Sequence, residues 1–230
     1  MLNNLLKELQ LKANPEKAKI YQRFFKTGDG HYGAGDIFLG LTMPEQRGVS
    51  NKYTDLSFSN IQKLLNSKIH EHRMSAGVIL TNKFKQKPVE TFNFYIKNAK
   101  KFNNWDLVDV TCTKIIGKFL LDKDRKILYD LAKSKNLWEK RISIVSTFAF
   151  IRKNELGDTL KISEILLKDK HDLIHKAIGW MLREVGKKDK EVLVDFLKTN
   201  YKNIPRTTLR YSIERFPENE RKRMLKGEFK

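Results

Sequence analysis

The segment with the clearest potential for chemistry is Trp105-Asp106-Leu107-Val108-Asp109, which follows two asparagines. Asparagine favours the N-cap of a helix, so we expect a helix to begin here. Trp105 and Asp109 would then share one face, since they are four residues apart. Asp109 would lie at the edge of the apolar stripe, partly shielded but within reach of a ligand. A carboxylate beside an indole face suits developing positive charge, and the indole contributes about 1–2 kcal/mol if desolvated.

Judged by residue type alone, each of these side chains could also have an ordinary structural role. A lone aspartate on a helix is more often a solvated acid than a catalytic group. Trp105 and Trp180 could both be packing residues, and Arg141 could pair with a neighbouring acid. Asp106 is expected to be structural, or to act as a first-turn partner of the helix dipole.

Metal and cofactor chemistry has weaker candidates. His171 and His175 are four residues apart, as in zinc sites, but no metalloprotease glutamate and no third ligand accompany them. His70 and His72 are two apart and would point to different helix faces. The single cysteine, Cys112, excludes an internal disulfide and a cysteine-based zinc site. We therefore expect no metal and no cofactor.

The elements that position these residues are expected to be helices. Nearly every segment after residue 56 has helical periodicity, and strand signals are almost absent. Four of the five prolines stand where helices should begin. We predict helices near residues 2–12, 15–25, 44–51, 58–68, 72–85, 89–101, 104–121, 123–134, 137–154, 159–169, 172–188, 190–203, 205–215 and 217–226. The fold class is therefore all-α.

A recurring pattern within these helices predicts a repeat architecture. A charged residue, an apolar residue and a small or apolar pair recur at intervals of 36, 32, 35 and 34, beginning at Arg73, Asp109, Arg141, Lys176 and Arg210. Such a period is typical of a helical solenoid, and tetratricopeptide and ankyrin signatures are missing. We expect one HEAT-like repeat domain over residues 1–230, with a non-repetitive helical bundle as the alternative. The mostly basic column would line a concave groove that suits a phosphate backbone.

Residues 27–40 interrupt the helical pattern, because they hold five of the twelve glycines. Glycine tolerates positive φ and breaks helices, so this segment is expected to be a loop or a short hairpin. No Gly-Lys-Ser/Thr follows and no strand–loop–helix context surrounds it, which argues against a nucleotide P-loop. A plain connection and a DNA-contacting loop both remain open.

The charge balance points to a polyanionic partner. Lys and Arg number 46 against 27 Asp and Glu, which gives a net charge of +19. Because the excess runs along the whole chain, nucleic acid ranks above a membrane surface or simple solubility. Met1–Lys7 lacks the apolar core of a signal peptide, and the apolar stretch 142–151 is too short to cross a bilayer. We expect a cytoplasmic monomer that associates with the nucleoid when bound to DNA.

Three motifs in order carry a family resemblance. Trp105-Asp106-Leu107-Val108-Asp109, then Leu137-Trp138-Glu139-Lys140-Arg141, then Lys176-Ala177-Ile178-Gly179-Trp180-Met181-Leu182-Arg183-Glu184 resemble the signature segments of the AlkD-type alkylpurine DNA glycosylases. The resemblance spans about residues 14 to 184. It implies a DNA repair enzyme that hydrolyses the N-glycosidic bond of cationic alkylated purines, such as 3-methyladenine and 7-methylguanine, in duplex DNA.

The resemblance also implies residue roles. Asp109 would be the catalytic carboxylate, Trp105 and Trp180 would wall the cleft beside the deoxyribose, and Arg141 would hold a backbone phosphate. Phe24 stands at the lesion-contacting position where the usual prototype has tyrosine. The basic residues of the repeat column, Lys176, Arg73 and Arg210, would contact further phosphates. A cationic purine leaves as a neutral base, so one carboxylate could suffice where most glycosidases need two.

Two other functions remain open. The Gly-rich segment replaces a shorter connection of the family, and some relatives with such loops appear among non-catalytic binders. The main alternative is therefore a non-catalytic HEAT-like protein that binds branched or distorted DNA. The other alternative is a protein-binding scaffold, which would not lose DNA affinity steeply with salt.

Overall fold

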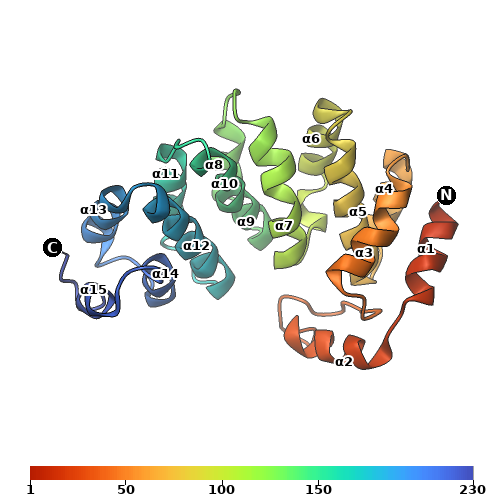
Figure 1. Ribbon diagram of the computed structural model, residues 1–230, viewed down its shortest axis with the longest axis horizontal. Coiled ribbons are helices and arrows are strands. Elements are labelled where there is room, and N and C mark those ends of the chain that lie inside the picture. The colour runs from red at the N-terminus through yellow and green to blue at the C-terminus, as the bar shows by residue number, and fades with distance from the viewer. Residues whose placement is uncertain (230) are drawn as a thin grey trace. The chain divides into compact units, whose positions relative to one another are not determined.

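The computed structural model describes residues 1–229, and it is built from helices and connecting turns (Figure 1). Within those residues there is no β-strand, only an isolated bridge between Ile37 and Ile69. The predicted all-α class is confirmed. The chain divides into two compact units, one spanning Met1–Thr111 and one beginning at Cys112. No helix of the described part has the length and apolar character to span a membrane. The single repeat domain with a basic groove remains a prediction.

The first unit holds the N-terminal helices and two short 3₁₀ turns. Their bounds are α1 (Leu2–Leu11), α2 (Pro15–Phe24), α3 (Met43–Ser50), η1 (Asn51–Tyr53), α4 (Phe58–Leu65), α5 (His70–Lys83), α6 (Pro88–Lys97), η2 (Ala99–Lys101) and α7 (Trp105–Cys112), which ends on the first residue of the next unit. Local sequence explains the starts. At α2, Asn14 Oδ1 accepts the Lys17 N–H at 3.0 Å and Pro15 fills the first helical position. At α3, the Glu45 carboxylate accepts both the N–H and the hydroxyl of Thr42.

The second unit continues the helical pattern. It contains η3 (Thr113–Gly117), α8 (Lys126–Ala132), α9 (Leu137–Ser146), α10 (Phe148–Ile151), α11 (Gly157–Leu166), α12 (Asp172–Lys188), α13 (Lys190–Asn200), α14 (Arg206–Ser212) and α15 (Glu218–Met224). The long helix α12 packs against α9, α13 and α14. Side-chain caps begin several helices: Asn136 Oδ1 accepts the N–H groups of Trp138 and Glu139, and Asp189 Oδ1 accepts that of Val192. These helices begin where the cap residues predict.

The helix predicted over 89–101 ends at Lys97, before the 3₁₀ turn η2. Two further helices that were expected to be continuous are also interrupted. The helix predicted over 104–121 becomes a π-helical turn at Thr113–Gly117. A Cβ at Gly117 would lie 2.2 Å from the Ser146 carbonyl oxygen, so the backbones approach too closely for any side chain there. The helix predicted over 137–154 divides at Thr147, whose hydroxyl donates to the Ile144 carbonyl instead of facing solvent. Close packing and a local hydrogen bond therefore override the helical pattern at these points.

Residues 27–40 form a loop without hairpin pairing. Ile37 of this loop forms the isolated bridge with the chain before α5. Its N–H donates to the Lys68 carbonyl at 3.0 Å, and its carbonyl accepts from the His70 N–H at 2.8 Å. The loop ends at Gly40, where φ is +87° and a Cβ would lie 2.2 Å from the Asn14 carbonyl oxygen. Gly40 therefore meets two demands that only glycine satisfies, a left-handed φ and a close approach to the start of α2.

Candidate functional site

The start of α7 places the residues with predicted chemistry. Asn104 is buried, and its Oδ1 accepts the Trp105 N–H at 2.8 Å. Trp105 and Asp109 lie one helical turn apart and both are half-buried. Val108 is fully buried, so Asp109 lies beside the core stripe instead of inside it. This position matches the one expected from the helical period.

An aromatic cluster supports the Trp105 indole. Phe25 stacks on Trp105, with ring centroids 5.3 Å apart and planes 19° apart, and it also stacks on Phe38 at 5.0 Å. Phe24 meets Trp105 edge-on at 5.9 Å and is 60% exposed. Offset stacks and edge contacts are the favourable aromatic geometries, so the indole is held by its neighbours. The structure therefore brings Trp105 and Phe24, two of the predicted lesion-contacting residues, together.

A buried charge network lies behind this cluster. The His70 ring, which begins α5, contacts Asp106 through Nε2 at 2.8 Å and Asp36 through Nδ1 at 3.4 Å. The Asp36 carboxylate also forms an ion pair with Arg73 at 2.6 Å. His70, Arg73 and Asp36 are all nearly inaccessible to solvent. Because buried charges need partners, these groups are mutually required.

The electrostatics favour a protonated His70. Burial disfavours the imidazolium, but the charge of Asp106 and the hydrogen bonds to Asp106 and Asp36 outweigh burial and raise the His70 pKa to about 9. The ring also stacks on Phe38 at 4.6 Å, and an imidazolium over an aromatic face is favourable. His72 behaves in the opposite way, since burial and the charge of Arg73 lower its pKa to about 4. At neutral pH the first histidine is therefore charged and the second is neutral.

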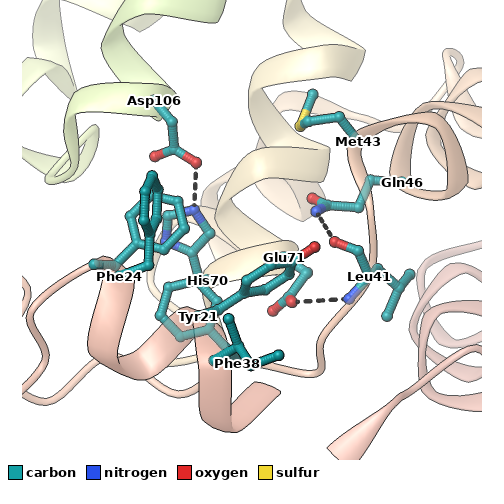
Figure 2. Close-up of a pocket in the computed structure, with 11 residues that line it drawn as sticks. Tyr21, Phe24, Phe38, Leu41, Met43, Gln46, His70, Glu71 and Asp106 are labelled. Atoms are coloured by element: carbon teal, nitrogen blue, oxygen red, sulfur yellow. Dashed lines mark hydrogen bonds and ion pairs between the residues drawn. The ribbon is translucent and has the colours of Figure 1, made fainter. Parts of the chain in front are cut away.

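A cavity of about 300 Å³ opens beside this network, and Figure 2 shows the side chains around it. Its lining is mainly aromatic and aliphatic and includes Ile20, Tyr21, Phe24, Phe25, Phe38, Leu41, Met43, Gln46, His70, Glu71 and Asp106. Trp105 is not among the lining residues. The cavity can accept an apolar or planar group, while its one charged pair, His70 and Asp106, is internally neutralised.

Glu71 fixes the wall of this cavity. Its fully buried carboxylate accepts the N–H groups of Leu39, Gly40 and Leu41 at 2.9, 2.8 and 3.3 Å. These three successive amides have no strand partner, so the carboxylate supplies the acceptors that they need. The pKa of the neighbouring Tyr21 hydroxyl is raised above its usual value, first by burial and then by the negative charge of Glu71.

Other predicted site residues belong to the second unit. Trp180 on α12 is half-buried, and its ring lies 6.0 Å from that of Phe148. Arg141 on α9 is 5% exposed, and its Nη1 donates to the Leu173 carbonyl at 2.6 Å. Lys176 forms an ion pair with Asp172 at 2.7 Å. Arg210 is exposed on α14. Of these cations, Arg210 is thus the most open to a phosphate.

Arg73 has a different environment from the one its repeat position suggests. It is 3% exposed, its Nη1 donates to the Ser67 carbonyl at 2.7 Å, and its Nη2 pairs with Asp36. A phosphate contact would require this buried ion pair to open and would leave Asp36 without its cation. Arg73 is therefore the predicted phosphate contact that its environment favours least.

Asp36, His70 and Asp106 of the charge network, and Glu71 in the cavity wall, were not among the predicted site residues. Asp36 lies in the Gly-rich loop, and the sequence offers no spacing rule that links it to residues more than thirty positions away. The only available signal was the run of ionisable residues at positions 70–73, where a helix begins. In residues 1–229, no group of three or more histidine, cysteine or acidic side chains is arranged to hold a metal ion.

The chain is an all-helical protein with a net charge of +19, which suits a polyanionic partner, and comparison with known proteins gives its family. A family model for DNA alkylation repair enzymes matches residues 5–216, so the chain belongs to this family and DNA is its partner. A solved structure described as a predicted DNA alkylation repair enzyme from Enterococcus faecalis has a TM-score of 0.73 to this chain. The two are 16% identical, and the match covers 90% of this chain and 97% of that chain, which supports the common fold. A search of curated proteins finds no match.

Proposed function

We propose that this protein is a DNA glycosylase that releases cationic alkylated purines, such as 3-methyladenine and 7-methylguanine, from duplex DNA. The observation that carries the proposal is the pair on α7: Asp109 and Trp105 lie one turn apart, both half-buried, in a chain of the DNA alkylation repair family. A carboxylate and an indole face in this arrangement suit a sugar that develops positive charge.

The chemistry needs only one acid. A purine alkylated on a ring nitrogen already carries positive charge, so it departs as a neutral base without a general acid. The remaining task is to stabilise the oxocarbenium-like deoxyribose and to orient water, which a single carboxylate can do. Trp105, Trp180 and Phe24 would contact the lesion and its deoxyribose in this proposal.

Two carboxylates compete for this role at the start of α7. Asp106 is committed to His70 through Oδ2 and to the Leu107 N–H through Oδ1, both at 2.8 Å. An acid held in a buried ion pair stabilises that pair first and is poorly available to a substrate cation. We assign Asp109 to the reaction because it is half-buried on α7, one helical turn from Trp105.

Backbone binding would come from the cations of the second unit. We assign Arg141, Lys176 and Arg210 to phosphates of the duplex, and the net charge of +19 supports salt-sensitive DNA association. The DNA partners that we propose for this protein are alkylated or distorted duplexes. The monomeric state remains a prediction.

The test is release of methylated base from alkylated duplex DNA by the wild-type chain, by Asp109→Asn and by Asp55→Asn. Asp55 is an exposed acid of the same unit, so its variant removes the same charge elsewhere. We expect release by the wild type and by Asp55→Asn, and a loss of about 100-fold or more in Asp109→Asn with DNA affinity retained. Absence of release from all three, together with tight binding to branched DNA, would replace the glycosylase with a non-catalytic binder.

A further inference from the structure

We propose that His70 is the positioning residue of the candidate site: by bridging Asp36 and Asp106, it holds the first turn of α7, and with it Trp105 and Asp109, against α5 and the loop 27–40. The link from this positioning to base release rests on the proposed function, because it assumes that Trp105 and Asp109 serve the reaction. The positioning itself is a structural claim that can be tested separately.

The bridge joins segments that are distant in the sequence. His70 reaches Asp106, 36 residues away, at 2.8 Å and Asp36, 34 residues away, at 3.4 Å. Figure 2 shows the contact between the His70 ring and the Asp106 carboxylate, both of which line the cavity. Asn104, immediately before α7, closes the same network by contacting Asp36 at 3.5 Å. The helix that carries Trp105 and Asp109 is thus tied at both Asn104 and Asp106.

A second path links His70 to the indole. The imidazole lies against Phe25 at 5.1 Å and against Phe38 at 4.6 Å, and Phe25 stacks in turn on Trp105. A change in the position or charge of the imidazole would therefore reach Trp105 through the aromatic cluster as well as through Asp106. Packed rings transmit such changes because the interior has little free volume.

Only a protonated ring can make the whole bridge. A neutral histidine has one ring N–H, so one of its two carboxylate partners would face a lone pair. Although burial opposes the charge, Asp106 and Asp36 raise the His70 pKa to about 9. The two other titratable side chains nearby change charge away from pH 9: the His72 pKa is lowered to about 4, and the Tyr21 pKa is raised above its usual value. The remaining charged groups are held by partners, since Glu71 accepts from three amides and Arg73 pairs with Asp36.

The structural test is ¹⁹F NMR of the full chain labelled with 5-fluorotryptophan, with Trp105 assigned by Trp105→Phe. We expect the Trp105 resonance to shift with a midpoint near pH 9 in the wild type and to lose this midpoint in His70→Gln. His72→Gln is the matched control, because His72 lies on the same helix and contacts Ser67 instead of Asp36 or Asp106. A Trp105 resonance that does not respond near pH 9, or that responds equally in His70→Gln, overturns the proposal.

A second variant keeps the test decisive if His70→Gln does not fold. Asp106→Asn removes the charge that most strongly favours the imidazolium but retains an acceptor for the Leu107 N–H. We expect the Trp105 midpoint to move down by about one pH unit or more. An unchanged midpoint in this variant contradicts the bridge.

The functional test is single-turnover base release at neutral pH. We expect His70→Gln to slow release by about 10- to 100-fold with DNA affinity nearly unchanged, since small displacements of reacting groups are costly. His72→Gln should release base at the wild-type rate. Equal rates in His70→Gln and wild type overturn the role in positioning the reaction. Absence of release from the wild type as well refutes the proposed glycosylase activity. The bridge between His70 and the two aspartates is then tested by the ¹⁹F midpoint alone.

Discussion

The buried His70 makes the stability of the chain depend on pH in a defined direction. Its pKa in the folded protein is about 9, whereas the ordinary value is 6.5. Between these values the folded state binds a proton that the unfolded state does not, so the free energy of unfolding falls as pH rises. The stabilisation is fully present below pH 6.5 and is lost as pH rises through about 9.

The size of the effect follows from the two pKa values. A pKa difference of one unit between the folded and unfolded states corresponds to about 1.36 kcal/mol. A pKa that rises from 6.5 to about 9 on folding therefore contributes about 3 kcal/mol to the free energy of unfolding. His70 is 2% exposed, so solvent screening reduces this little. His72 acts outside this window, because its pKa is lowered to about 4 and its effect appears below pH 6.5, where stability falls on acidification.

The assay is urea unfolding of wild type and His70→Gln at a series of pH values, followed by circular dichroism. We expect the difference in unfolding free energy between the two chains to shrink by about 3 kcal/mol between pH 6.5 and pH 9.5. Other titrating groups are common to both chains and cancel in this difference. A difference that stays constant across the window would show that His70 is neutral in the folded chain and would refute the reasoning.

Three further outcomes are expected. Glu71→Gln leaves buried amides without a full set of acceptors, so it should lower stability by about 2–4 kcal/mol and speed hydrogen exchange at the amides of residues 39–41. Gly40→Ala places a Cβ 2.2 Å from the Asn14 carbonyl at a φ of +87°, and thermal unfolding should report a loss of more than about 2 kcal/mol. Arg210→Ala removes an exposed cation, so the salt dependence of DNA binding should weaken by about 0.9 in its logarithmic slope; an unchanged slope would exclude a phosphate contact.

The sequence predicts the helices well where caps and prolines mark their starts. The expected beginnings at residues 137, 172 and 190 agree with the structure, since Asn136, His171 and Asp189 each accept a backbone N–H there. The five charged repeat positions also fall on helices of the fold, namely α5, α7, α9, α12 and α14. Such features are local, so a reading of neighbouring residues can find them.

The charge network could not be predicted in the same way. Arg73 and Arg141 occupy equivalent repeat positions and look alike in sequence, yet Arg73 is neutralised by Asp36 and Arg141 donates to the Leu173 carbonyl. The partner Asp36 comes from an irregular loop, whose course depends on tertiary contacts instead of a period. The π-helical turn at Thr113–Gly117 likewise follows from the close approach of Gly117 to Ser146.

The carboxylate of Glu71 also links the opening of the N-terminal segment to that of α5. The three amides that it binds lie next to Asn14, whose N–H donates to the Leu39 carbonyl at 2.8 Å, so α2 is anchored through them. These amides donate to a carboxylate on the first turn of α5, so they lose their acceptor when that turn opens. We therefore expect α2, which presents Phe24, and residues 39–41 to open as one cooperative unit in native-state hydrogen exchange.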